Sequence, residues 1–498
     1  MNASVFLETR RHVGPIDSRM FGGFLEHIGR AVYGGVYDPG NSLSDTSGFR
    51  KDVIEALRRM RMPVVRYPGG NFVSNYDWRD GIGPKERRPA RPDFAWKTIE
   101  PNTFGVDEFV AWCQKLGTSP MMVVNLGTGT AKDAAELVEY CNLPQGTYWS
   151  DRRVANGVKA PYAIKLWGLG NEMDGPWQAG HVPPEVYAQR AAQAAQLMKG
   201  LDPTIELVLA GSSSCLMPTY MAWDRVLLEY CWDHVEYIAA HRYSGNPASD
   251  TPRFLAEGVE VDRILEDYAS LIGYVRALKK SNKKVYLAFD EWNVWYRERH
   301  RDYTWWQGAP PLLEEIYNLE DALVVAQFLN SFIRHADVVK VACLAQIVNV
   351  IAPVVTRPDG LLIQSIYYPF VLYSEHATGI ALVPMIDSPT YRAGDRGDVP
   401  VLDGAASFNP EQSAIGVFLV NRSLEHDLKV DVTLCDRSIK RVKDVKVLSG
   451  DDPKAANWWD DRDMVKLVRG KAKLQDDGRV QVHVPAPGLA VFDLELSK

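Results

Sequence analysis

Long apolar runs are missing from this sequence. Only Val5-Phe6-Leu7 precedes the charged residues Glu8, Arg10 and Arg11, which is too short for the apolar core of a signal peptide. No stretch approaches the ~20 uninterrupted apolar residues that a membrane helix needs. We therefore expect a cytoplasmic protein that does not bind membranes.

Cysteine clusters, basic patches and paired histidines are also missing. The six cysteines are scattered without CxxC spacing, as expected for thiols of a cytoplasmic protein. The net charge of −7 comes without a basic patch, so nucleic acid is not an expected partner. The ten histidines include no HxH or HExxH pair, which disfavours a metal hydrolase.

An alternation of strand-like and helix-like segments runs from Phe21 to about Val350. Eight strands and the helices between them predict an α/β protein with a parallel (β/α)8 barrel, also called a TIM barrel. A doubly wound sheet is the alternative, but no GxGxxG or phosphate loop follows the first strand. The predicted strands are Phe21–His27, Pro63–Asn71, Pro120–Leu126, Ile164–Glu172, Glu206–Ser212, Tyr237–Tyr243, Val285–Asn293 and Val338–Val348.

The pattern changes at about His376, where apolar and polar residues begin to alternate between Gly, Asp, Asn and Pro turns. This pattern is typical of an antiparallel β-sandwich, which we expect to be jelly-roll-like. We therefore place the barrel at 16–375 and the sandwich at 376–498. Residues 1–15 contain one short alternating run, which is expected to add a strand to the sandwich.

Polar residues lie at the C-terminal ends of the predicted strands, where active sites of such barrels are found. Carboxylates and amides dominate this set, and such a lining suits a polyhydroxylated substrate, whose hydroxyls need new hydrogen-bond partners. The set comprises Glu26, His27, Arg66, Asn71, Asn125, Asn171, Glu172, Ser212, Ser213, His241, Tyr243, Glu291, Asn293, Gln346 and Asn349.

Glu172 and Glu291 each follow a buried strand in the same strand-to-turn context. A single acid in such a place is more often a structural ion-pair partner. Two acids on different barrel strands are the minimum equipment for hydrolysis of a glycosidic bond. The pair therefore favours catalysis over a purely structural role.

Four stretches carry a resemblance to a known family: Phe21–Gly35, Arg66–Asn71, Gly168–Glu172 and Asp290–Asn293. Together they closely resemble the α-L-arabinofuranosidases of glycoside hydrolase family 51. The resemblance implies that Glu172 is the general acid/base and Glu291 the nucleophile of a retaining reaction. It also implies an exo-acting enzyme that removes arabinofuranose from arabino-oligosaccharides or arabinoxylan fragments without a cofactor or metal, and a homohexamer.

The same resemblance implies further substrate-binding residues. Glu26 and Asn71 would bind sugar hydroxyls, Asn171 would bind the 2-hydroxyl, and Tyr243 would orient the nucleophile. Arg66, Trp96, Trp295 and Gln346 complete the predicted pocket, and Trp295 begins a segment expected to cover the substrate. His241 is included, although a lone histidine is as often a core residue. For Trp305 and Trp306, pocket, core and subunit interface all remain open.

Two alternatives remain at this point. The same barrel and acids could serve an endoglucanase or another retaining glycosidase, because a fold does not fix a substrate. The protein could also be a non-catalytic carbohydrate-binding protein whose sandwich binds sugar. The presence of both Glu172 and Glu291 disfavours this second alternative.

Overall fold

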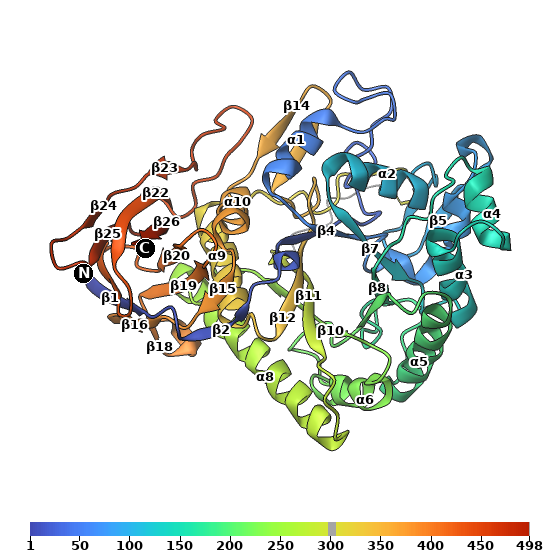
Figure 1. Cartoon of the computed structure of the whole chain (residues 1–498). Helices are drawn as coiled ribbons and strands as arrows, with labels where there is room; N and C mark the ends of the chain where they lie inside the picture. The colour runs from blue at the N-terminus through green and yellow to red at the C-terminus, as the bar shows by residue number, and fades with distance from the viewer. Residues whose placement is uncertain (297–304, 498) are drawn as a thin grey trace.

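The computed structural model describes residues 1–296 and 305–497 and has two parts, a barrel and a C-terminal β-domain (Figure 1). The β-domain lies to the left in Figure 1, and both ends of the chain are in it. Residues 297–304, within the predicted substrate-covering segment, lie outside the described residues. Among the described residues, no helix has the length and apolar character to cross a membrane.

Eight parallel strands close into a barrel, and every predicted barrel strand is confirmed. Most observed strands are shorter than predicted, because the polar residues at their C-terminal ends belong to the following loops. β8, for example, ends at Leu169, before Asn171 and Glu172. In chain order the barrel consists of β3 (Gly22–Phe24), β4 (Val64–Tyr67), β7 (Ser119–Val124), β8 (Leu166–Leu169), β9 (Glu206–Leu209), β10 (Tyr237–Ser244), β11 (Tyr286–Val294) and β12 (Val339–Ala345).

Helices surround the barrel, and those next to each other in the ring pack against one another (Figure 1). α2 ends as its sequence indicates, because Gly117 adopts a left-handed φ of 86° that favours glycine. The helices are α1 (Lys51–Arg59), α2 (Val106–Leu116), α3 (Ala131–Asn142), α4 (Tyr148–Ala155), α5 (Pro184–Leu201), α6 (Ala222–Cys231), α7 (Thr251–Phe254), α8 (Glu257–Leu278), α9 (Leu319–Arg334) and α10 (Tyr367–His376).

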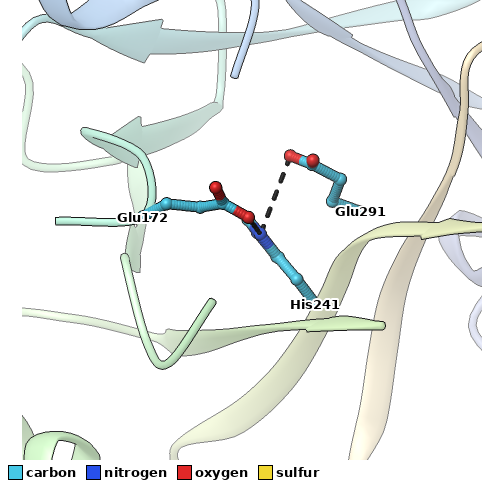
Figure 2. A group of neighbouring side chains, drawn as sticks. All are labelled: Glu172, His241 and Glu291. Atoms are coloured by element: carbon cyan, nitrogen blue, oxygen red, sulfur yellow. Dashed lines mark hydrogen bonds and ion pairs between the residues drawn. The ribbon is translucent and has the colours of Figure 1, made fainter. Parts of the chain in front are cut away.

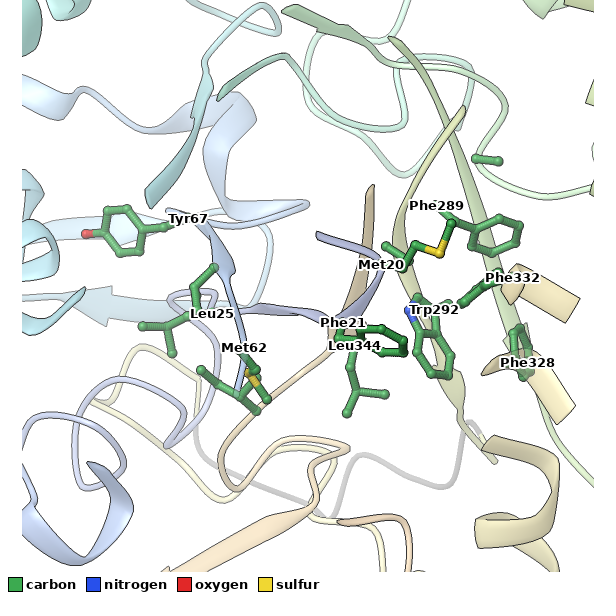
Figure 3. Close-up of a cluster of buried hydrophobic side chains, with 14 of the residues drawn as sticks. Met20, Phe21, Leu25, Met62, Tyr67, Phe289, Trp292, Phe328, Phe332 and Leu344 are labelled. Atoms are coloured by element: carbon green, nitrogen blue, oxygen red, sulfur yellow. The ribbon is translucent and has the colours of Figure 1, made fainter. Parts of the chain in front are cut away.

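Aromatic packing fixes β11, the strand that carries Glu291 (Figure 3). The ring of Trp292 stacks on Phe328 of α9 with centroids 5.1 Å apart. Phe289, on the same strand, lies 5.2 Å from Phe332 of α9. These buried contacts hold the backbone on both sides of Glu291.

The C-terminal domain consists of two facing β-sheets with their own apolar core. One sheet has the order β16 (Met385–Asp387), β1 (Asn2–Leu7), β21 (Leu428–Leu434), β25 (Val480–Val484) and β24 (Ala472–Leu474). The other has the order β2 (His12–Pro15), β15 (Ile380–Leu382), β19 (Leu402–Asn409), β20 (Ala414–Asn421), β26 (Gly488–Leu496), β22 (Ile439–Ser449) and β23 (Val468–Arg469). β1 pairs in parallel with β21, so the N-terminal segment belongs to this domain.

Two hairpins in the loops of the barrel have no counterpart in the sequence prediction. One joins β5 (Arg91–Asp93) to β6 (Thr98–Glu100), and its turn carries Trp96. The other joins β13 (Val354–Arg357) to β14 (Gly360–Ile363). The first hairpin reaches the candidate site.

Candidate active site

Two glutamates meet at the C-terminal end of the barrel. Glu172 follows β8 and Glu291 lies on β11, and His241 of β10 lies between them (Figure 2). One carboxylate oxygen from each glutamate and one ring nitrogen of His241 lie within 4.8 Å of one another. All three side chains are buried.

Glu291 is held through both of its oxygens. The Tyr243 hydroxyl donates to Oε1 at 2.8 Å, and the Arg66 guanidinium donates to Oε2 at 2.7 Å. His241 Nδ1 approaches Oε2 at 3.7 Å. A carboxylate held through both oxygens has little freedom to rotate.

Glu172 has different partners. His241 Nδ1 lies 3.0 Å from Oε1, and the indole nitrogen of Trp177 donates to Oε2 at 2.7 Å. The Trp177 ring is half exposed, so this side of Glu172 faces the mouth of the site. Glu172 has a φ of 44°, a left-handed conformation that is unfavourable outside glycine and that occurs preferentially at functional sites.

Asp290 joins two cationic side chains beneath the glutamates. His241 Nε2 lies 3.2 Å from Asp290 Oδ1, and Arg66 Nε lies 3.3 Å from Asp290 Oδ2. Burial alone would lower the pKa of His241, but the charge of Glu291 and the hydrogen bonds to Asp290 and Glu172 raise it to about 10. Burial would raise the pKa of Asp290, but Arg66 and His241 outweigh it and hold that pKa below its usual value. The imidazolium and guanidinium thus stabilise Asp290 as a carboxylate.

The geometry of Glu172, His241 and Glu291 would place three donors around a small cation. The charges oppose such binding. A ring with a pKa of about 10 is protonated at neutral pH and offers no lone pair, and Arg66 already neutralises Glu291 Oε2. The cluster is therefore better suited to moving protons than to holding a metal.

Glu26 forms a second part of the pocket. Its Oε1 accepts from the Trp96 indole and the Phe72 backbone, each at 3.0 Å, and its Oε2 accepts from Gln346 Nε2 at 3.0 Å. Gln346 Oε1 in turn accepts from the Glu26 backbone nitrogen at 2.7 Å. Burial, together with the charge of Glu291, raises the pKa of Glu26 to about 7.

Gly70 lies close to polar atoms of Glu291, Asn171 and Glu26. A β-carbon on Gly70 would lie 3.2 Å from Glu291 Oε2, 3.3 Å from Asn171 Nδ2 and 3.5 Å from Glu26 Oε2. Asn171 Oδ1 accepts from Arg66 at 2.5 Å, whereas its buried Nδ2 has no hydrogen-bond partner within the described ranges. A ligand hydroxyl could satisfy this donor.

Most of the predicted site residues come together here. Trp295 stacks edge-on against Tyr243 with centroids 5.1 Å apart, so it also borders the site. Asn71 differs, because its half-buried side chain makes no hydrogen bond to any described residue. Trp305 and Trp306 are 60% and 42% exposed, and the Trp306 backbone donates to Lys97 of the β5–β6 turn.

The sequence prediction missed Asp290 and Trp177. In a regular strand, neighbours such as Asp290 and Glu291 would point to opposite faces. The pairing of β11 with β12 is irregular between Phe289 and Trp292. Asp290 and Glu291 therefore both reach Arg66 and His241. Trp177 could have been found from the sequence only as an aromatic residue five positions after Glu172.

A parallel barrel with two acids within 4.8 Å at its strand ends is the arrangement of a glycoside hydrolase, and the Asn171 Nδ2 donor without a partner among the described residues lies beside them. Two sequence families specify this class further. Residues 56–254 match the α-L-arabinofuranosidase 1 domain, and residues 290–487 match the α-L-arabinofuranosidase C-terminal domain.

Known proteins agree with this match over nearly the whole chain. A relative from Acetivibrio thermocellus named intracellular exo-α-(1→5)-L-arabinofuranosidase is 48% identical over 88% of this chain and 87% of its own. A relative from Bifidobacterium longum named exo-α-(1→6)-L-arabinofuranosidase is 41% identical over 95% and 93%. The solved structure of a family 51 α-L-arabinofuranosidase from Bifidobacterium longum superimposes with a TM-score of 0.95, at 36% identity over 99% of each chain. The chain therefore belongs to the α-L-arabinofuranosidases of glycoside hydrolase family 51, as its motifs indicate.

Proposed function

We propose that this protein is a retaining, exo-acting α-L-arabinofuranosidase that releases terminal arabinofuranose from arabino-oligosaccharides and arabinoxylan fragments. The observation that carries the proposal is the approach of Glu172 and Glu291 to within 4.8 Å. Retaining glycosidases have carboxyl groups about 5–5.5 Å apart, whereas inverting enzymes leave about 6.5–9.5 Å for a water molecule. The spacing therefore supports direct attack by one carboxylate.

In the first step, Glu291 forms a bond to the anomeric carbon as the glycosidic carbon–oxygen bond breaks. Glu172 gives its proton to the departing oxygen. In the second step, a water molecule gives a proton to Glu172 and its oxygen attacks the anomeric carbon. The bond to Glu291 breaks, and the free carboxylate returns.

The contacts of the two acids support this division of roles. Glu291 is held in place by Tyr243 and Arg66, as suits a nucleophile that must attack from one direction. Glu172 faces the half-exposed Trp177 at the mouth, where a leaving group has to depart. Because His241 contacts both acids, it is placed to respond to their changes of charge.

The remaining groups suit the terminal sugar. Glu26 is placed to accept from sugar hydroxyls, and the unpaired Asn171 Nδ2 is placed to donate to one. Trp96 and Trp295 would contact the apolar edges of the ring. Of the predicted ligands, Asn71 has the weakest support, since nothing orients its side chain toward the acids.

The substrate class and the cellular location are proposed from the names of the relatives. One relative is named for (1→5) linkages and another for (1→6) linkages, so we propose arabinose-containing oligosaccharides as the substrate class without assigning one linkage. Relatives are named intracellular, which supports a cytoplasmic location. The family resemblance also supports a homohexamer, which light scattering of the purified protein would test.

The first test is hydrolysis of 4-nitrophenyl α-L-arabinofuranoside beside the β-D-xyloside and β-D-glucoside, with Glu291→Ala as the control. We expect cleavage of the arabinofuranoside alone, and its loss in the variant. Release of short fragments from a β-glucan would favour the endoglucanase alternative. Sugar binding without turnover of any substrate would favour the carbohydrate-binding alternative.

A second test separates the two acids. Glu172→Ala should spare formation of the glycosyl enzyme from aryl arabinofuranosides with good leaving groups, because such groups need little protonation. Glu291→Ala should abolish turnover of every substrate. Equal losses on activated and unactivated substrates in the Glu172 variant would contradict the assigned roles.

A further inference from the structure

Behind the sugar pocket lies a second layer of buried polar side chains. Glu26 and Arg66 belong to the pocket, and each is followed in the chain by a residue of this second layer. These following residues, His27 and Tyr67, contact each other, with His27 Nε2 2.7 Å from the Tyr67 hydroxyl. Both are buried, and neither takes part in the proposed chemistry.

Glu100, the last residue of β6, completes the second layer. Its Oε2 lies 2.8 Å from His27 Nδ1, a polar contact whose alignment falls short of a hydrogen bond. Its Oε1 accepts from the Asn102 backbone nitrogen at 2.7 Å and from the Tyr33 hydroxyl. Glu100 is only 6% exposed, so water cannot replace these partners without opening the structure.

The β5–β6 hairpin connects Glu100 to Trp96. Within its turn, Asp93 accepts from the backbone nitrogens of Ala95 and Trp96, at 2.9 and 3.2 Å. Lys97 completes the turn with a left-handed φ of 57°. The hairpin is therefore attached to two consecutive residues of the barrel, to Glu26 through the Trp96 indole and to His27 through Glu100.

We propose that Glu100 is a positioning residue, which holds this hairpin so that the Trp96 indole stays on Glu26 and thereby sets the affinity for the terminal sugar. The inference rests on the proposed function, because it assumes that Glu26 and Trp96 bind that sugar. Glu100 acts through Trp96, and it touches neither catalytic acid. Its loss should therefore weaken sugar binding more than it slows the chemical steps.

A double-mutant cycle with Glu100→Ala and Trp96→Phe tests the proposal. Glu100→Ala should raise the KM for 4-nitrophenyl α-L-arabinofuranoside about tenfold, within the range found for residues coupled in one hydrogen-bond network, and change kcat less than about threefold. In the Trp96→Phe background, where the indole donor is already gone, the same change should raise KM less than about twofold. Asp80→Asn is the matched control, because Asp80 pairs with Arg91 of the same hairpin outside this network, and it should leave KM unchanged.

Tyr33→Phe provides a milder variant in case Glu100→Ala does not fold. It removes one donor to Glu100 and the acceptor of the Phe104 backbone nitrogen while keeping the carboxylate, and it should raise KM about threefold, less than Glu100→Ala does. Equal increases in KM in both Trp96 backgrounds would overturn the proposal. So would a fall in kcat as large as the rise in KM.

Failure of the proposed function would give a different result. Wild-type protein that leaves the arabinofuranoside intact contradicts the proposed function alone. The position of Trp96 is then compared directly in crystal structures of the wild type and of Tyr33→Phe or Glu100→Ala. Displacement of the indole from Glu26 supports the positioning role, and an indole still bonded to Glu26 in the variant overturns it.

Discussion

Replacing Tyr243 with phenylalanine removes one oxygen atom from the site and keeps the aromatic ring that packs on Trp295. The missing hydroxyl donates to Glu291 Oε1 at 2.8 Å. In the proposed mechanism, Glu291 is a carboxylate in the free enzyme and an ester in the glycosyl enzyme. The hydrogen bond is therefore strong before the first step, weak in the intermediate, and strong again after the second step.

Tyr243→Phe should slow mainly the second step, because Glu291 regains its negative charge in that step. A hydrogen bond to a charged group contributes about 1.5–3 kcal/mol, and a transition state with about half the charge restored would gain about half of that. Loss of about 0.8–1.5 kcal/mol slows departure of Glu291 from the sugar by about 4- to 12-fold. Formation of the glycosyl enzyme should not slow, because the lost hydrogen bond is stronger to the free carboxylate than to the partly charged transition state of that step.

Pre-steady-state hydrolysis of 4-nitrophenyl α-L-arabinofuranoside measures both steps. Tyr243→Phe should show a burst of nitrophenol followed by a slower steady rate, and mass spectrometry should detect the accumulated glycosyl enzyme. Tyr230→Phe is the matched control, because Tyr230 is half exposed on α6, and its kinetics should not change. A Tyr243→Phe enzyme without a burst, whose kcat/KM falls as much as its kcat, would refute the reasoning.

Three further predictions concern the same pocket. The pKa of Glu26 is about 7, so below that pH its carboxylate takes up a proton and accepts sugar hydroxyls less well, and KM should rise. Glu26→Gln should give a high KM that does not change with pH. A wild-type KM that stays constant from pH 5.5 to 8 would contradict the prediction. The pKa of His241 rises on folding from its usual 6.5 to about 10, so its contribution to stability is complete below 6.5 and is lost as the pH rises to about 10. The melting temperature should therefore fall over this range, and less steeply in His241→Gln; parallel profiles would contradict the prediction. Gly70→Ala places a methyl group 3.2 Å from Glu291 Oε2 and 3.3 Å from Asn171 Nδ2, so one of these side chains has to shift. The change should lower kcat/KM about tenfold or more, and unchanged kinetics would contradict a role for their exact placement.

The barrel was predictable from sequence because its strands are short apolar runs with polar residues at one end. The run that precedes Glu172 contains Leu166, Trp167 and Leu169, all buried inside the protein. Active sites of such barrels form at these strand ends, and this rule alone predicts that Glu172 and Glu291 share one site. Periodicity and one positional rule therefore sufficed for the pair of acids.

Asp290 and the β5–β6 hairpin were harder to predict, because their places in the site depend on local departures from regular structure. Strand alternation places Asp290 away from Glu291, and only the irregular pairing of β11 brings both to Arg66 and His241. The β5–β6 hairpin has two strands of three residues each, and β5 contains a proline. Such short strands form through contacts with the barrel, as between Glu100 and His27, and not through their own propensity.

The C-terminal β-domain also contributes to the site, although its contribution is indirect. Helices outside a barrel usually expose a polar face, yet α9 is buried from Leu319 to Ile333. Strands β19 and β20 cover its outer side, where Asp403 accepts from Asn330 at 2.7 Å and pairs with Arg334 at 3.1 Å. The inner side of α9 packs on the aromatic residues that flank Glu291. Without the β-domain, α9 would expose this outer side to water and lose its partners, so the domain supports the strand that carries the proposed nucleophile.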